Sequence, residues 1–359
     1  MFLTQHAAQR RLPVVLLSGF LGSGKTTLVN ALLRDPRLAD TAVAINEFGE
    51  VPLDQLLIEH GEDRTVVLAN GCLCCRLAGD FEDAVMRVFS RRQSGELPQF
   101  ARLLIEPSGL ADAAPIAQAI MRNPVMAGAL RLEAIIATVD AVLVEGQLAR
   151  HPETRKQIAL ADQLVVTKSD MVDAAALTRV TSLVRRFNPV APIHTAVLGK
   201  IDTAALLPAG FIDPTDAAAA RHARTGLLAE HVTAPAAAEH DDATTAVSLF
   251  ADVPLAWRAF DAWLRRLRIA HAKDLLRIKG IVDIAGTSGP VVIQCVEHVM
   301  HAPLMLDHWP TAGRRSQLVV ISRGLEPASI RALWSEALPD LRATSNLRAT
   351  PDLSAATVH

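Results

Sequence analysis

The sequence has almost no net charge and no long apolar run. Its 359 residues include 36 Lys and Arg against 38 Asp and Glu, which gives a formal net charge of −2. Because such a chain lacks the basic field that holds nucleic acid, we expect no nucleic-acid partner. The apolar run from Leu132 to Val144 is interrupted by Asp140. It falls short of the roughly 18 apolar residues that a membrane helix needs, so we expect no membrane partner either.

Cysteine is also scarce, and three of the four cysteines lie in the stretch Cys72-Leu73-Cys74-Cys75. Neighbours so close in sequence cannot link distant segments, which excludes a disulfide framework. A reduced thiol site in the cytoplasm is favoured instead. The apolar residues Val14 to Leu17 are too few for a signal peptide, and we expect them to form the first strand.

Short apolar runs alternate with helical stretches from Pro13 to about Val197. The expected strands cover 14–17, 41–45, 65–68, 102–105, 134–139, 163–166 and 192–195, and the expected helices cover 25–34, 79–92, 114–121, 155–160 and 174–187. Alternation of this kind predicts an α/β fold with a mostly parallel sheet covered by helices on both faces. The ligand of such a sheet binds at the carboxyl ends of its strands.

The composition changes twice after this region. We expect a first domain over 1–205 and an Ala- and Pro-rich linker over 206–245. A smaller α+β domain is expected over 246–343, because strand patterns there flank a helix that carries Trp257 and Trp263 on one face. The polar end, 344–359, is expected to be a disordered tail.

The stretch from Gly19 to Thr26, with the sequence GFLGSGKT, matches a phosphate-binding loop between a buried strand and a helix. Its glycines let backbone N–H groups turn inward around phosphates. The Lys25 side chain reaches the outer phosphates, and the Thr26 hydroxyl can bind Mg²⁺. The residues expected to bind the nucleotide phosphates are Gly19, Gly22, Ser23, Gly24, Lys25, Thr26 and Thr27. This predicts a P-loop nucleotide-binding protein.

A second apolar strand ends in Glu106 and is followed by Pro107-Ser108-Gly109. A carboxylate at this position can hold Mg²⁺ or its waters, together with Thr26. The N–H of Gly109 can face the γ-phosphate as a switch does. We therefore expect Lys25, Glu106 and Gly109 to be the catalytic residues.

A third strand ends in Thr167-Lys168-Ser169-Asp170. An aspartate can accept both N–H groups on the Watson-Crick edge of guanine, whereas adenine offers no matching pair of donors, so Asp170 favours GTP over ATP. The stem of Lys168 would pack along the base, and Thr167 precedes it. An ATP-dependent P-loop ATPase or kinase without metal delivery is the first alternative.

The three clustered thiols, Cys72, Cys74 and Cys75, suit a soft transition metal such as Zn²⁺, Cu⁺ or Co²⁺. Glu47 and Glu50 are nearby carboxylates, and we take Glu50 as a further ligand. The second alternative follows from the same thiols: a zinc-binding or redox-sensing protein in which the nucleotide only stabilises the fold.

Other metal-binding residue types are expected to be structural. Cys295 stands alone in an apolar strand and should be buried. His298 and His301 follow it at a spacing that would place Cys295 and His298 on opposite faces of a strand. The linker holds a further set, too sparse to predict a site: His222, His231 and His240.

Taken together, the motifs resemble the CobW-like (CobW/YjiA) family of metal-handling P-loop GTPases, which is related to HypB and UreG. The resemblance rests on the phosphate loop and on five further stretches: Asn46 to Glu50, Asn70 to Cys75, Glu106 to Asp112, Thr167 to Asp170, and Leu276 to Gly280 with the later Trp309. Members of this type can carry a glutamate where this chain has Ile45, so one metal ligand is absent.

The resemblance implies hydrolysis of GTP with Mg²⁺, coupled to binding and delivery of a transition metal to a client metalloprotein. Zn²⁺ is the metal that the family most often handles, and Co²⁺ is an alternative. It also places the metal on Cys72, Cys74 and Cys75, beside the nucleotide switches. Slow hydrolysis that is raised by a partner or by self-association into a homo-oligomer is a hypothesis.

Overall fold

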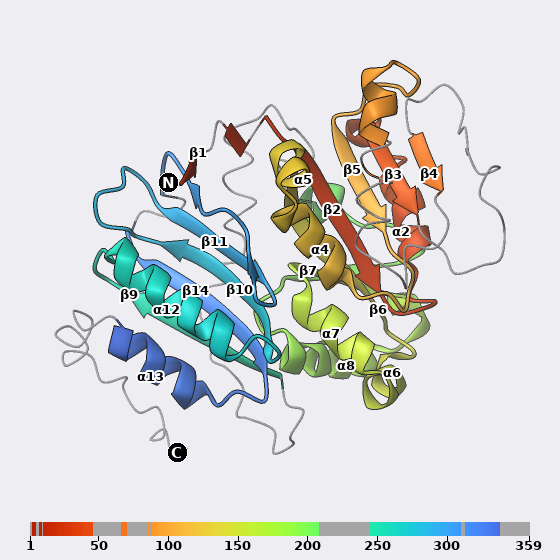
Figure 1. The fold of residues 1–359 in the computed structure, drawn as a ribbon. Coiled ribbons are helices and arrows are strands. Elements are labelled where there is room, and N and C mark those ends of the chain that lie inside the picture. Colours follow the sequence, from red (N-terminus) through yellow and green to blue (C-terminus); the bar gives the residue numbers. More distant parts are fainter. Residues whose placement is uncertain are drawn as a thin grey trace, which may run out of the picture.

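The computed structural model describes residues 2–4, 7–8, 10–45, 66–69, 85, 88–207, 244–309 and 313–337. Within these ranges the chain forms two sheets, each with its own helices (Figure 1). The first sheet and its helices make an α/β domain. The second sheet lies beside it and includes residues from both ends of the described chain.

The first sheet is parallel throughout its described part, in the order β4-β3-β5-β2-β6-β7-β8. Its strands are β2 (Leu12–Gly19), β3 (Thr41–Ile45), β4 (Val66–Ala69), β5 (Arg102–Glu106), β6 (Leu130–Asp140), β7 (Gln163–Thr167) and β8 (Ile193–Ala196). The predicted α/β fold with a parallel sheet is confirmed. Because β2, β5, β6 and β7 are adjacent or nearly so, their carboxyl ends meet at one edge of the sheet.

Helices cover both faces of this sheet. Successive side chains of a strand point to opposite faces, and the strands carry apolar side chains on both. On β2, Val14 and Leu16 pack with the helix over 113–122, whereas Val15 and Leu17 pack with the helix over 25–32. The helices are α2 (Lys25–Leu32), α4 (Ala113–Arg122), α5 (Pro124–Ala129), α6 (Val144–Arg150), α7 (Pro152–Leu160), α8 (Ala174–Phe187) and α9 (Thr203–Leu206). Apolar residues on alternate positions of each strand therefore fill two layers of core.

The second sheet is antiparallel except at one edge, in the order β1-β13-β11-β10-β14-β9, with β12 paired to β11. Its strands are β1 (Leu3–Thr4), β9 (Thr244–Ala251), β10 (Leu275–Val282), β11 (Val291–Val296), β12 (Val299–Met300), β13 (Leu304–Met305) and β14 (Ser316–Arg323). The exception is β1, which runs parallel to β13. This N-terminal strand joins the C-terminal sheet, a pairing that the expected first domain of 1–205 does not include.

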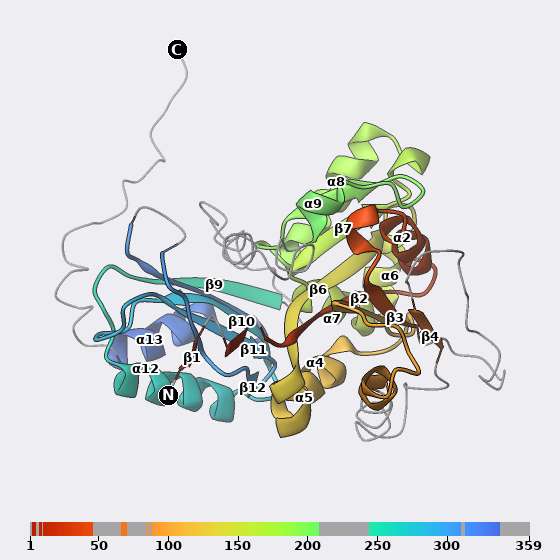
Figure 2. The same ribbon diagram turned by 90° about the horizontal axis from the view of Figure 1, so that it is seen from above.

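The second sheet is covered by two helices on one face, and part of its other face packs against the first domain (Figures 1 and 2). On β14, Leu318 and Val320 pack with α12 (Trp257–Ala270) and α13 (Pro327–Ala337). Val319 and Ile321, on the other face of β14, belong to the apolar cluster that includes β2 and α4 of the first domain. One apolar core is thus shared by the two sheets.

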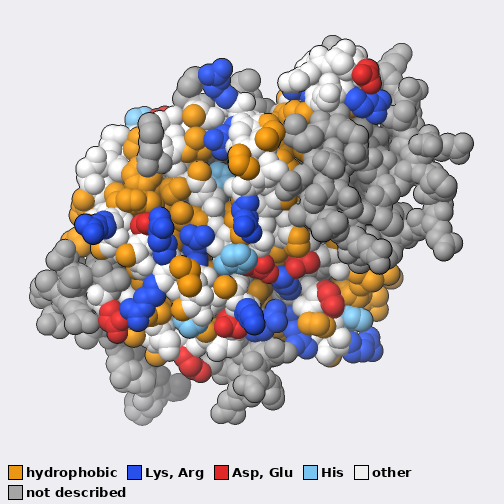
Figure 3. Space-filling model, viewed as in Figure 1, with side chains coloured by type: hydrophobic (Ala, Val, Ile, Leu, Met, Phe, Trp, Pro, Cys, Tyr) orange, Lys and Arg blue, Asp and Glu red, His pale blue; other side chains and the backbone are white. Residues whose placement is uncertain are grey.

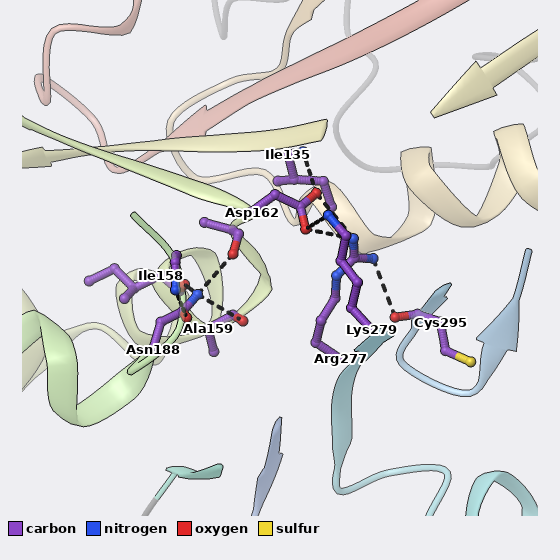
Figure 4. Close-up of polar contacts among 10 residues, drawn as sticks. Ile135, Ile158, Ala159, Asp162, Asn188, Arg277, Lys279 and Cys295 are labelled. Carbon is purple, nitrogen blue, oxygen red and sulfur yellow. Dashed lines mark hydrogen bonds and ion pairs between the residues drawn. The ribbon is translucent and has the colours of Figure 1, made fainter. Parts of the chain in front are cut away.

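A buried ionic contact also joins the domains, at the point where α7 meets β10 (Figure 4). Asp162 accepts hydrogen bonds from Arg277 at 2.8 and 3.1 Å and from Lys279 at 3.0 Å. It also accepts one from the backbone N–H of Ile135 at 2.9 Å. Burial would raise the pKa of the Asp162 carboxyl, but the two cations reverse this effect and hold the pKa below its usual value. Asp162 is therefore ionised at neutral pH.

The molecular surface carries charges of both signs on the face that Figure 3 shows, with apolar side chains between them. No helix in the described residues is long and apolar enough to cross a membrane. Several predictions from the sequence concern residues outside the described ranges. These are residues 208–243 of the linker, the tail over 344–359 and most of the helix over 79–92.

Candidate functional site

A cavity of about 440 Å³ opens at the carboxyl edge of the parallel sheet. Its walls come from the loop after β2 with the start of α2, from the end of β5 with the turn that follows it, and from the residue after β7. The residues of these three segments that line it are Leu21, Gly22, Gly24, Lys25, Thr26, Thr27, Glu106, Pro107, Ser108, Gly109 and Lys168. The structure thus brings together most of the predicted nucleotide-binding residues, which lie in three separate parts of the sequence.

The phosphate loop ends at Gly24, which precedes α2 with φ 87° and ψ 22°. This left-handed conformation suits glycine, because a Cβ would be strained there. It turns the first free N–H groups of α2 toward the loop, which creates an anion site. The Lys25 ammonium lies in the loop, where it donates to the carbonyl oxygens of Gly19 at 3.0 Å and Phe20 at 3.4 Å.

The Thr26 hydroxyl donates to Oε1 of Glu106 at 2.7 Å. These two residues lie 80 positions apart in the chain, and the adjacency of β2 and β5 brings them together. A hydroxyl and a carboxylate oxygen are ligands that Mg²⁺ prefers. This donor set, beside an anion site, fits a Mg²⁺ ion that accompanies a bound nucleotide.

Gly109 packs against the backbone of the phosphate loop. A Cβ at this position would lie 2.6 Å from both the Cα and N atoms of Leu21 and 3.0 Å from the Lys25 ammonium. No side chain fits, because the nearest atoms belong to the backbone. Glycine is therefore required if the 106–109 turn is to approach the phosphate loop this closely.

The Thr-Lys-x-Asp stretch lies at the end of β7, next to the phosphate loop. Thr167 Oγ1 donates to the carbonyl oxygens of Ser23 at 2.7 Å and Val139 at 3.2 Å. Lys168 lines the cavity and pairs with Oδ2 of Asp140 at 2.6 Å. Asp170 is exposed in the short 3₁₀ turn Ser169–Met171. Thr167 thus ties the loop expected to read the base to the loop expected to hold the phosphates.

Four predicted residues do not line the cavity, namely Gly19, Ser23, Thr167 and Asp170. The Ser23 hydroxyl is buried and hydrogen-bonds the Thr138 hydroxyl at 2.6 Å, so it faces the sheet. Ser23 can contact a nucleotide only through its backbone in this arrangement. Gly19 contributes the carbonyl oxygen that holds the Lys25 ammonium.

Comparison with protein families agrees with this geometry. Residues 13–195 match the family described as CobW/HypB/UreG, nucleotide-binding domain, and residues 244–338 match the Cobalamin synthesis protein cobW C-terminal domain. The chain belongs to the CobW/HypB/UreG family. Membership makes it a P-loop NTPase. The first matched range spans the parallel sheet, and the second spans every strand of the other sheet except β1.

Relatives of the CobW-family chain match it along most of its length. The zinc chaperone YjiA of Escherichia coli (strain K12) is 30% identical over 322 residues, which cover 90% of this chain and 97% of YjiA. The zinc chaperone CobW of Pseudomonas aeruginosa is 31% identical and covers 89% of this chain and 90% of its own length. The crystal structure of Zn(II)-bound YjiA GTPase from E. coli superposes with a TM-score of 0.66 at 27% identity, covering 91% of this chain and 99% of that structure.

The metal ligands expected of this CobW-family chain, Cys72, Cys74, Cys75 and Glu50, lie outside the described residues. So do the linker histidines. Within the described ranges, no group of three or more His, Cys, Asp or Glu residues is placed to hold a metal ion.

Cys295 is buried in β11 as predicted, and burial raises the pKa of its thiol to about 12. His298 lies in the turn between β11 and β12 rather than on a strand. The ring Nδ1 of His301 lies 2.9 Å from the carbonyl oxygen of Ala302.

Asp140 is the residue at this site that sequence reasoning missed. It is fully buried at the end of β6, where Oδ1 accepts from the backbone N–H of Val142 at 2.8 Å while Oδ2 pairs with Lys168. The available signal was its position, since Asp140 ends an apolar strand just as Glu106 does. Its role is to fix the Lys168 ammonium beside the cavity.

Proposed function

We propose that this protein is a cytoplasmic GTPase that binds and hydrolyses GTP with Mg²⁺ and couples the reaction to delivery of Zn²⁺ to a client metalloprotein. The observation that carries the proposal is the meeting of Lys25, the Thr26–Glu106 pair, Gly109 and Lys168 around one cavity. Membership of the CobW/HypB/UreG family and relatives named zinc chaperones support it.

Hydrolysis of GTP requires a site that stabilises the negative charge on the phosphate oxygens. Water attacks the γ-phosphorus, the bond to the oxygen of the β-phosphate breaks, and GDP and inorganic phosphate are released. The Lys25 ammonium and the N–H groups at the start of α2 stabilise the charge on the phosphate oxygens. Gly109, packed against Leu21 and Lys25, supports an additional N–H contact with the γ-phosphate.

Thr26 and Glu106 would hold Mg²⁺, which when bound neutralises charge on the β- and γ-phosphate oxygens. The Thr26 hydroxyl and the Glu106 carboxylate are already 2.7 Å apart, so both oxygens face one point beside the loop. The side chains therefore need no large movement to act together.

Base selection falls to Lys168 and Asp170. Asp140 holds the Lys168 ammonium through an ion pair, and Thr167 is hydrogen-bonded to the carbonyl oxygen of Ser23. The two residues that precede Ser169-Asp170 are therefore both held in place. An exposed carboxylate in this place can accept the two N–H groups of a guanine edge. This arrangement supports GTP as the substrate.

The metal half rests on Cys72, Cys74 and Cys75, with Glu50 as a further ligand. Thiolates of this kind bind Zn²⁺ tightly, and Co²⁺ is the alternative cargo. Such cysteines stay reduced, and so able to bind metal, in a reducing compartment, which is why we propose the cytoplasm. The site lies in the sequence between β3 and β5, and the last residue of β5, Glu106, lines the nucleotide cavity.

The GTPase half is tested by hydrolysis of Mg-GTP and Mg-ATP by the purified full chain. We expect GTP to be preferred by about 100-fold or more, and Asp170→Asn to remove most of this preference. We expect Thr26→Ala to weaken the dependence on Mg²⁺, and Thr178→Ala, on the surface of α8, serves as the control. Equal use of ATP would instead indicate an ATPase or kinase.

The metal half is tested by Zn²⁺ titration of the reduced protein against a competing chelator. We expect Cys74→Ala to abolish tight binding. Cys295→Ala is the matched control, since Cys295 is buried in the C-terminal sheet. Tight binding that survives Cys74→Ala would contradict the assignment of the thiol site.

A further inference from the structure

Helix α7 holds the turn that carries Gly109. The side chain of Gln157 is buried, and its Nε2 donates to the carbonyl oxygens of Gly109 at 3.1 Å and Ala111 at 3.4 Å. Any movement of Gly109 relative to the phosphate loop must therefore change its contact with α7. The neighbouring residue Lys156 extends this contact into the C-terminal domain.

The Lys156 ammonium lies 2.5 Å from Oδ2 of Asp112 and 2.5 Å from Oε1 of Glu297. Burial alone would lower the pKa of Lys156, but its hydrogen bonds to these two carboxylates raise the pKa above its usual value. Lys156 is thus a cation at neutral pH that bridges two anions. One of them, Asp112, belongs to the segment after Gly109, and the other belongs to the second domain.

Both carboxylates are held at a second point by α4. The other oxygen of Asp112 accepts from the backbone N–H of Ala114 at 2.9 Å and so caps this helix. The other oxygen of Glu297 accepts from Nε2 of Gln118 at 2.6 Å. The result is a closed ring of contacts that runs from Asp112 through Lys156 and Glu297 to Gln118 and back along α4.

Glu297 has a backbone conformation that is unfavourable for glutamate. Glu297 lies in the turn between β11 and β12 with φ 51°, in the left-handed region that disfavours side chains with a Cβ. Glycine or asparagine would suit this turn better. The cost of placing glutamate here is offset by the contacts that its carboxylate makes with Lys156 and Gln118.

The segment held by this ring has space beside it. A cavity of about 170 Å³ lies between the two domains, lined among others by Asp112, Lys156, Gln157 and Arg323. Arg323 ends β14 of the C-terminal sheet. The segment after Gly109 is therefore fixed by hydrogen bonds and ion pairs rather than by close packing on this side.

We infer that Glu297, acting through Lys156, is a positioning residue for the nucleotide switch, by which the C-terminal domain sets the preference between GTP and GDP. This rests on the proposed function, because it takes Gly109 as the group that meets the γ-phosphate. A contact that favours one position of the 109–112 segment favours the nucleotide that binds to that position. By reciprocity, the bound nucleotide changes how firmly Glu297 is held.

The test measures affinities of the full-length protein for fluorescent GDP and for a fluorescent non-hydrolysable GTP analogue, both with Mg²⁺. We expect the ratio of the two dissociation constants to change by about fivefold or more in Glu297→Gln and in Glu297→Gly. The glycine variant removes the side chain while it relieves the turn, so a loss of stability cannot account for both results. Lys156→Met should shift the ratio in the same direction, and its combination with Glu297→Gln should add nothing further.

Glu336→Gln is the matched control, because Glu336 forms an exposed ion pair with Arg266 at 3.4 Å, on the helices α12 and α13 away from this ring. We expect its ratio to equal that of the wild type. An unchanged ratio in both Glu297 variants, with nucleotides still bound, would overturn the role of Glu297 and leave the proposed GTPase intact. Absence of guanine-nucleotide binding by the wild type would overturn both.

Discussion

Replacing Asp162 by asparagine should lower the free energy of unfolding of the C-terminal domain, because it breaks the buried ionic contact between the two domains. Asp162 is the counter-charge for Arg277 and Lys279, and all three side chains are buried. Asparagine keeps the shape but removes the anion to which both buried cations are hydrogen-bonded. Loss of one partner of a buried ion pair costs about 3–5 kcal/mol, because the remaining charge is not solvated. We expect a loss of this size for Asp162→Asn.

Tryptophan fluorescence during urea unfolding measures this loss. All four tryptophans of the chain, Trp257, Trp263, Trp309 and Trp334, belong to the C-terminal domain, and the chain has no tyrosine. The emission therefore reports unfolding of that domain alone. We expect its midpoint to move to lower urea in Asp162→Asn, with a loss of about 3–5 kcal/mol from the linear extrapolation.

Asp261→Asn is the control, because Asp261 pairs with the exposed Arg265 one turn along α12 at 2.8 Å. Exposed pairs contribute about 0–1 kcal/mol, so this variant should unfold almost as the wild type does. If Asp162→Asn loses no more than Asp261→Asn, the buried contact does not stabilise the C-terminal domain and the reasoning is refuted.

Three further predictions concern the nucleotide cavity and the domain junction. Gly109→Ala forces the Leu21 backbone to move, at a cost of about 1–3 kcal/mol, and should weaken binding of a GTP analogue by roughly tenfold or more in a fluorescence titration. Asp140→Asn releases the Lys168 ammonium and should lower the GDP-over-ADP preference in the same titration. Burial lowers the pKa of Lys279 to about 8, so the folded protein loses this proton before the unfolded chain does. The contribution of Lys279 to the free energy of unfolding should therefore increase as pH rises from about 8 to 10.5. The urea midpoint of Lys279→Met should lack this increase.

Each of these results has a contrary outcome. Undiminished affinity in Gly109→Ala would mean that the 106–109 turn does not meet the nucleotide. An unchanged base preference in Asp140→Asn would remove the positioning role of that carboxylate. Parallel pH dependence in the wild type and Lys279→Met would show that Lys279 titrates alike in the folded and unfolded chains.

Much of the fold could be predicted from the sequence, because local patterns determine it. The strand over 41–45 and the helix over 174–187 coincide with β3 and α8 in the structure. The phosphate loop was recognisable because its glycines and Lys25 are consecutive. The three cavity segments could be foreseen together, since each follows an apolar strand and parallel strands place their carboxyl ends at one edge.

The contacts between the domains could not be predicted in this way. Asp162 and Arg277 are 115 residues apart, and nothing near either residue indicates a charged partner. The strand β1 has only two residues, and it forms because β13 offers a free edge. Glu297 occupies a position that local preferences assign to glycine or asparagine. Such features depend on tertiary structure and become visible only in the folded chain.

The central claim, that GTP controls the handling of a metal, is tested most directly by Zn²⁺ affinity in three nucleotide states. The reduced protein is titrated against a competing chelator without nucleotide, with Mg-GDP and with a non-hydrolysable Mg-GTP analogue. We predict that the GTP-analogue and GDP states differ by about tenfold or more, and that Cys74→Ala abolishes the difference. Equal Zn²⁺ affinity in all three states would contradict the claim and leave a GTPase whose thiol site is independent of the nucleotide.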